Sequence, residues 1–178
     1  MENNLGPKTK KNLEDAFAGE SMARNKYDYF AKVARKAGYV QIANIFEETA
    51  RNEKEHAKLW AKQLGLINDL ENDLKEAIKG EAYETQEMYP RMSKEALEEG
   101  HQEIATLFRE VGEAEKAHET RYRKLLENLE KGEVFKRTEV KKWKCDNCGY
   151  IHEGTEAPDK CPSCLHPQGH FELFVETY

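Results

Sequence analysis

Apolar residues recur every three or four positions from the start of the chain to about residue 131, with charged residues between them. That spacing is typical of amphipathic helices. It predicts four helices, at about 9–36, 39–64, from near Asp69 to Gly100, and 101–131. The apolar stripes follow the seams of helices that pack nearly parallel or antiparallel. The sequence therefore predicts an all-α four-helix bundle.

Glycine and proline mark where these helices end or bend. Gly38 and Gly100 should stop the first and third helices, because glycine tolerates the left-handed conformation that ends many helices. Pro90 falls inside the third helix. We expect a kink there, because proline cannot donate to the carbonyl four residues back.

The helical pattern stops after Gly132. Residues 132–142 are strongly charged and are interpreted as a linker, and residues 143–178 show no helical period. This organisation predicts two domains, a helical bundle at 1–137 and a small metal-binding β/loop domain at 138–178. The second domain is too small to fold on a hydrophobic core alone, so it should need a metal.

An internal repeat places candidate metal ligands in both halves of the bundle. Residues 38–60 and 100–122 match at an offset of 62 positions, and each copy contains a Glu-x-x-His pair. Positions three apart face the same way on a helix, so each pair offers a carboxylate and an imidazole together. The pairs are Glu53 with His56 and Glu115 with His118.

The preceding helices add one carboxylate to each half, because residues 16–20 match residues 77–81 and pair Glu20 with Glu81. Two lone glutamates and two Glu-x-x-His pairs are the ligand set of ferritin-like di-iron bundles. Carboxylates with one imidazole per metal suit iron or manganese better than zinc alone. A third such pair, Glu98 with His101, straddles Gly100 and has no counterpart in the repeat, so we interpret it as incidental.

Glu84 breaks the symmetry, because its counterpart in the first half is Ala23. The carboxylates of Glu20, Glu53, Glu81 and Glu115 already balance the charge of two ferrous ions. In that state a fifth carboxylate would add an uncompensated negative charge. After oxidation the two ions carry more positive charge, and a fifth carboxylate helps to balance it. We therefore hypothesise that Glu84 coordinates mainly in the oxidised form.

Tyr27 and Tyr89 lie about two turns after Glu20 and Glu81. They are either core aromatics or phenols that orient a ligand carboxylate, and their spacing alone favours the core. Trp60 and Trp143 are interpreted as packing residues.

Four cysteines form two Cys-x-x-Cys pairs, Cys145 with Cys148 and Cys161 with Cys164. Two such pairs at this separation favour a metal over disulfides. Four thiolates suit iron or zinc equally, and zinc would give a purely structural site.

Composition and charge narrow the class of protein. Charged residues make up 35% of the 178 residues and the net charge is −6, which argues against a nucleic-acid partner. The sequence shows no signal-peptide pattern and no apolar run long enough to span a membrane. The expected compartment is the cytoplasm.

Taken together, GES at 19–21, NEKEH at 52–56, KGEAYE at 79–84, MYP at 88–90 and AEKAH at 114–118 resemble the rubrerythrin family. The tail CDNCGYIHEGTEAPDKCPSCLHPQGHFEL resembles the rubredoxin-like domain of that family. One departure is Gln168, where relatives often carry Lys.

The resemblance implies a ferritin-like bundle with a non-haem di-iron centre, in which Glu53 and Glu115 bridge the irons. The remaining ligands would be Glu20, His56, Glu81, Glu84 and His118. One iron would move between His56 and Glu84 on redox change. Tyr27 and Tyr89 match second-sphere tyrosines of the family. The tail would hold one iron on Cys145, Cys148, Cys161 and Cys164.

The activity implied by the resemblance is the two-electron reduction of hydrogen peroxide to water in oxidative stress defence. Electrons would pass through the rubredoxin-like iron from an external donor, either a rubredoxin or an NAD(P)H-dependent reductase. A homodimer or larger homo-oligomer would place the tail of one chain against the bundle of another. The main rival is a ferroxidase or iron-handling protein, and a zinc-ribbon interaction module is a third alternative.

Overall fold

The computed structural model describes residues 5–177, which divide into two compact units. The first unit ends at Asp69 and the second begins at Leu70. Within the described range, no helix is long and apolar enough to cross a membrane.

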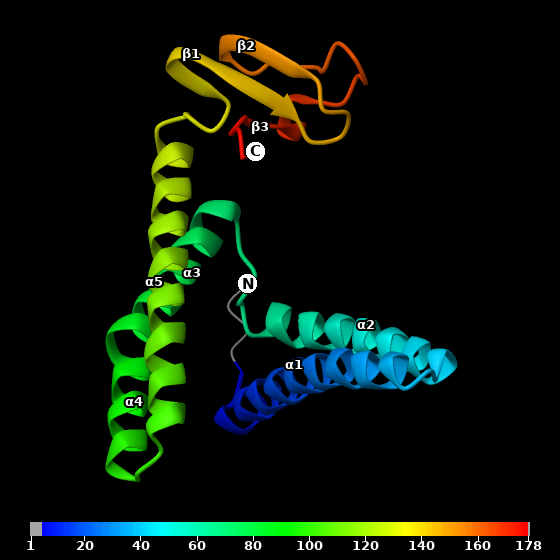
Figure 1. The fold of residues 1–178 in the computed structure, drawn as a ribbon, viewed down its shortest axis with the longest axis vertical. Coiled ribbons are helices and arrows are strands. Elements are labelled where there is room, and N and C mark those ends of the chain that lie inside the picture. The colour runs from blue at the N-terminus through cyan, green and yellow to red at the C-terminus, as the bar shows by residue number, and fades with distance from the viewer. Residues whose placement is uncertain (1–4, 178) are drawn as a thin grey trace. The chain divides into compact units, whose positions relative to one another are not determined.

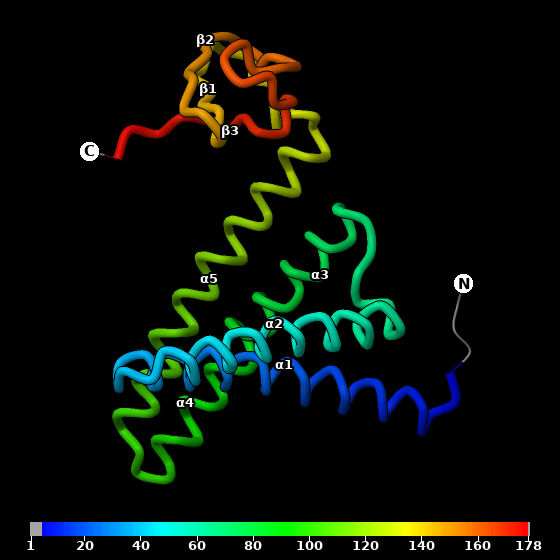
Figure 2. The backbone as a smooth tube through the Cα atoms, turned by 90° about the vertical axis from the view of Figure 1, so that its right-hand side faces the viewer, coloured from blue at the N-terminus to red at the C-terminus, as the bar shows by residue number. Residues whose placement is uncertain are grey.

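The first unit is a hairpin of two long helices, α1 (Pro7–Lys36) and α2 (Val40–Gln63), which lie side by side in Figures 1 and 2. Pro7 suits the first turn of a helix, where its missing N–H leaves no bond unmade. Gly38 adopts a φ of +86° just after α1, as expected for a helix-terminating glycine. The contact face is lined by small buried residues, which allow close approach of the backbones: Ala31, Ala43, Ala50, Ala57 and Ala61.

The helical part of the second unit contains α3 (Leu70–Tyr83), α4 (Tyr89–Glu98) and α5 (Gln102–Glu130). Gly100, with a φ of +84°, ends α4 as predicted. The third predicted helix is not one regular rod. It is interrupted by a π-helical turn, η1 (Glu84–Met88), which lies directly before Pro90. The expected irregularity at Pro90 thus takes the form of a widened turn on its N-terminal side, where the proline leaves a carbonyl without its usual donor.

The C-terminal part is a three-stranded antiparallel sheet in the order β2-β1-β3. The strands are β1 (Lys136–Cys145), β2 (Ile151–Glu156) and β3 (Phe171–Leu173), with a 3₁₀ turn, η2 (Gln168–His170), before β3. Their core is small and includes two of the cysteines: Trp143, Cys145, Ala157, Cys161 and Phe171.

The interpretation of residues 132–142 as a linker was wrong for its second half, because β1 begins at Lys136. The charged residues that suggested a linker lie on the outside of the strand and pair with acidic residues. Lys136 Nζ lies 3.5 Å from Glu156 Oε2, and Lys142 Nζ lies 3.9 Å from Glu153 Oε1. The solvent-exposed face of an antiparallel strand can carry this much charge, so charge density alone did not distinguish β1 from a loop.

Candidate metal centres

The first ligand cluster, Glu20, Glu53 and His56, lies in the α1–α2 hairpin. Glu20 comes from α1 and the other two from α2, and one ligand atom of each lies within 4.8 Å of the others. The Nδ1 atom of His56 is 2.8 Å from Glu53 Oε2 and 3.8 Å from Glu20 Oε1. The Glu-x-x-His spacing therefore places carboxylate and imidazole together, as predicted.

The second ligand cluster, Glu81, Glu115 and His118, repeats this geometry in the other unit. Here Glu81 comes from α3, and the Glu-x-x-His pair comes from α5. The Nδ1 atom of His118 is 2.6 Å from Glu115 Oε2 and 3.7 Å from Glu81 Oε2. Each cluster thus offers two carboxylates and one imidazole.

The electrostatics of both clusters fit a bound cation. The pKa of Glu20 is raised, chiefly by its hydrogen bond to Glu53 and then by burial. The pKa of Glu81 is raised by burial first and then by its hydrogen bond to Glu115. The Oε2 atom of Glu81 is also buried without a hydrogen-bond partner. Two neighbouring carboxylates repel each other when both are ionised, and a buried carboxylate oxygen without a hydrogen bond is unfavourable. A bound metal ion would offset both effects.

Glu84 lies outside the second ligand cluster but acts on it electrostatically. Its charge contributes to the raised pKa of Glu81. The pKa of Tyr89 is also raised, first by burial and then by the charges of Glu84, Glu115 and Glu81. Tyr89 therefore sits among the ligand carboxylates.

Both tyrosines are packed against neighbouring residues. Tyr89 has its Cβ 3.2 Å from where a Cβ on Gly112 would lie, so the glycine makes room for it. Tyr27 belongs to an aromatic group, with ring centroids 6.0 Å from Phe46 and 6.2 Å from Phe30. Tyr89 also has an aromatic neighbour, with ring centroids 6.2 Å apart from Phe108, so both tyrosines fit the core interpretation and the orienting role stays a prediction.

Glu98 and His101 belong to none of the three possible metal-binding groups in the described residues. Glu98 is the last residue of α4 and His101 precedes α5. The interpretation of this third Glu-x-x-His pair as incidental agrees with that placement.

Trp60 was interpreted as a packing residue, but the structure places its indole by the first ligand cluster. The indole acts on the Glu20 carboxyl, where it opposes the rise in pKa. Sequence spacing contained a usable signal, since Trp60 lies four residues after His56 on the same helical stripe. Trp143, by contrast, is fully buried and its Nε1 donates to Gly154 O at 3.0 Å, as suits a packing residue.

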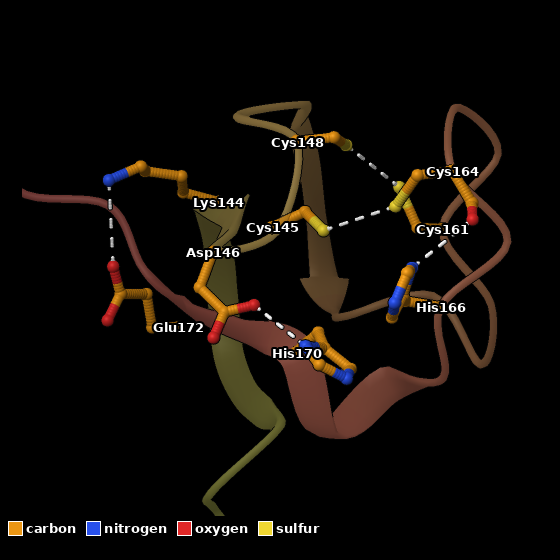
Figure 3. Close-up of polar contacts among 9 residues, drawn as sticks. All are labelled: Lys144, Cys145, Asp146, Cys148, Cys161, Cys164, His166, His170 and Glu172. Carbon is orange, nitrogen blue, oxygen red and sulfur yellow. Dashed lines mark hydrogen bonds and ion pairs between the residues drawn. The ribbon is translucent and has the colours of Figure 1, made fainter.

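The third group is the four-cysteine site, formed by the turns after β1 and around Cys161 (Figure 3). The Sγ atoms of Cys145 and Cys164 are 3.7 Å apart, and those of Cys148 and Cys161 are 3.6 Å apart. A tetrahedral metal at about 2.3 Å from each sulfur requires edges of about 3.8 Å. The four thiols are free and fit such a metal.

The surroundings of the thiols differ within the four-cysteine site. Burial raises the pKa of Cys145 to about 11. A backbone hydrogen bond from His166 lowers the pKa of Cys164 to about 5. Such backbone donors stabilise thiolates, the form in which cysteine binds metal. Gln168, the departure from the family pattern, donates from Nε2 to Ala157 O at 2.6 Å and so supports the loop between β2 and the second cysteine pair.

Comparison with known proteins identifies the class that this fold and these sites define. The family model for rubrerythrin matches residues 11–126, and the model for the rubrerythrin rubredoxin-like domain matches residues 143–172. The chain is 50% identical to rubrerythrin of Clostridium perfringens, with 100% of both chains covered. It is 46% identical to rubrerythrin of Nitratidesulfovibrio vulgaris, with 97% of both covered. It is also 45% identical to a putative rubrerythrin of Methanocaldococcus jannaschii, with 96% of this chain and 94% of the relative covered.

The protein therefore belongs to the class in which a helical di-iron domain is followed by a small four-cysteine domain. The chain belongs to the rubrerythrin family. Its ferritin-like helical class, its small C-terminal sheet and its two kinds of iron site are confirmed.

Proposed function

We propose that this protein is a di-iron peroxidase that reduces hydrogen peroxide to water. The observation that carries the proposal is the pair of matching ligand clusters, each with two carboxylates and one imidazole. The residues of both clusters would hold two irons, with Glu84 as a further ligand. When bound in the ferrous state, the irons would supply the two electrons that, together with two protons, reduce hydrogen peroxide to two water molecules.

The protein's own residues hold the site and manage charge and protons. The Nδ1 atoms of His56 and His118 face the carboxylates of Glu53 and Glu115, so that imidazole and carboxylate could hold the same metal ion. The half-buried Tyr89 phenol lies in a carboxylate-rich setting that raises its pKa, so it stays protonated and can donate to a ligand carboxylate. Tyr27 has the matching role in the first half of the proposed site.

The four-cysteine domain is proposed as the electron relay between the di-iron centre and an external donor, a rubredoxin or an NAD(P)H-linked reductase. Support comes from the site itself, where two thiols are fully buried and two lie nearer the surface. The proposed domain boundary follows residue 137, and the proposed assembly is a homodimer or larger homo-oligomer. Reduced thiols suit the cytoplasm, the proposed compartment.

Mixing the reduced protein rapidly with peroxide tests the activity. We expect fast oxidation by hydrogen peroxide at a fixed ratio of two irons per chain in the helical site. Glu115→Ala should abolish this reaction and leave the red colour of the ferric thiolate site intact. If the protein instead converts added ferrous iron into a mineral, it handles iron as a substrate and the peroxidase proposal is wrong.

A second variant tests the relay. Cys161→Ser should remove the colour of the four-cysteine site and stop repeated turnover with an external donor. A single reaction of pre-reduced di-iron centre with peroxide should survive. Native cycling in this variant would show that electrons bypass the four-cysteine domain.

A further inference from the structure

The Trp60 indole presents a buried donor that the α1–α2 hairpin does not satisfy. Its Nε1 atom is one of three buried side-chain polar atoms without a hydrogen-bond partner among residues 5–177. The others are Glu81 Oε2 and Thr85 Oγ1. Burying an N–H group without an acceptor is unfavourable, so an unpaired donor of this kind calls for a physical reason.

Its place in the hairpin supplies that reason. Glu53, His56 and Trp60 follow one another on α2 at steps of three and four, which puts them on one face of the helix. The same face meets Glu20 of α1, whose Oε1 lies 3.8 Å from His56 Nδ1.

We propose that Trp60 is a positioning residue, whose indole N–H donates to the Glu20 carboxylate when that carboxylate holds a metal ion. A carboxylate has two oxygens, so one can accept from Trp60 while the other binds the metal. The hydrogen bond would fix the orientation of Glu20 and complete the bonding of the buried indole. This inference rests on the di-iron site of the proposed function.

The repeat shows that this donor is confined to one half of the protein. The counterpart of Trp60 at an offset of 62 positions is Tyr122 on α5. Its ring lies under the guanidinium of Arg121, with 5.9 Å from Cζ to the ring centroid, and the Glu81 oxygen in that half stays unpaired. The two halves are therefore supported differently, one by an indole donor beside Glu20 and the other by an additional carboxylate, Glu84.

Metal affinity provides the first test. In full-length protein with the four-cysteine site already filled, Trp60→Phe keeps an aromatic ring at this position and removes the pyrrole ring with its N–H group. We expect it to weaken Co²⁺ binding at the helical site by about tenfold or more, the usual effect of losing a partner of a metal ligand. The matched control, Tyr122→Phe, should stay within about twofold of the native protein. Native affinity in Trp60→Phe would overturn the proposal.

The indole signals provide a test that needs no Trp60 variant. Trp60 and Trp143 are the only tryptophans, and Trp143 serves as a reference because its N–H already donates to Gly154 O. In ¹⁵N-indole NMR spectra of the full chain, assigned with Trp143→Phe, filling the helical site with Zn²⁺ should move the Trp60 signal and slow its exchange with water. The Trp143 signal should stay in place. A Trp60 signal that ignores Zn²⁺ binding overturns the proposal.

These outcomes are separable from those of the proposed function. A native protein that binds two metal ions in the helical site but does not react with peroxide refutes the peroxidase proposal alone. The affinity and NMR comparisons would still test Trp60.

Discussion

The backbone N–H of Tyr89 donates to the carbonyl of Glu84, five residues earlier, in place of the usual four. This bond closes the π turn between α3 and α4. The turn coincides with a change in the register of the repeat, because Glu20 matches Glu81 at an offset of 61 but Tyr27 matches Tyr89 at 62. The π turn therefore accommodates one residue that has no counterpart in the first half. The turn begins at Glu84, whose carboxylate also has no counterpart there.

Glu84→Ala makes the second half like the first, where Ala23 occupies this position. We expect the reduced protein to keep two ferrous ions with near-native affinity, because four carboxylates already balance their charge. The oxidised protein should bind iron more weakly and turn over peroxide at least tenfold more slowly. Iron content after gel filtration in each redox state checks this.

Glu87→Ala is the matched control, because Glu87 lies in the same π turn and is exposed. It should behave as the native protein in both redox states. Equal iron loss from reduced and oxidised Glu84→Ala would show that Glu84 is a permanent ligand, and the charge argument would be wrong.

Stability of the metal-free protein should depend on pH through Glu20 and Glu81. Both have a folded-state pKa raised above the ordinary value of 4.5. The folded state therefore holds these protons more tightly than the unfolded state, and this contribution to stability is complete below about pH 4.5. It is lost as pH rises through the raised pKa values.

The comparison that isolates this effect uses the Glu20→Gln/Glu81→Gln variant, which cannot titrate at these positions. Urea midpoints followed by helical circular dichroism should show the native metal-free protein losing stability relative to the variant between acid and neutral pH. A constant difference across that range contradicts the assignment. With metal bound the trend should reverse, because protons compete with the metal for the same oxygens.

The sequence was sufficient for features that repeat and insufficient for features that depend on a single contact. The in-phase positions of Glu53 and His56, seen twice, placed both ligand clusters correctly. The π turn was visible only as a kink at Pro90, because a one-residue insertion does not disturb the apolar pattern around it. The unpaired, buried N–H of Trp60 could not be predicted, since an indole on an apolar stripe has the same spacing whichever way its N–H points.

Removing the metal from the four-cysteine site should unfold the C-terminal sheet and leave the helices intact. The core of this sheet is small, and two of its members, Cys145 and Cys161, are ligands. In Trp60→Phe protein, Trp143 is the sole tryptophan, so its emission should shift to the red when a chelator is added under reducing conditions. Helical circular dichroism should change little. A buried Trp143 in metal-free protein would show that the core suffices without metal.

The turn after the second cysteine pair contains a residue in the left-handed backbone conformation. Leu165 has a φ of +63° and is the only non-glycine residue between 5 and 177 with a positive φ. Its backbone matches that of Gly149, whose φ is +78° after the first cysteine pair. In both turns an N–H bonds at 2.9 Å to a cysteine carbonyl four residues back, Leu165 to Cys161 and Gly149 to Cys145.

A side chain in this left-handed conformation costs about 1–2 kcal/mol, and Leu165 regains little by burial because it is 66% exposed. Leu165→Gly should therefore stabilise the metal-loaded C-terminal domain by up to about 1 kcal/mol, since the greater flexibility of unfolded glycine offsets part of the gain. Gly149→Ala should destabilise it by a similar amount, because a Cβ there meets nothing within 4 Å and the cost is conformational alone. Thermal unfolding followed by the thiolate absorbance of the iron site measures both. A less stable Leu165→Gly protein would mean that the exposed leucine makes a stabilising contact, and the conformational argument would fail.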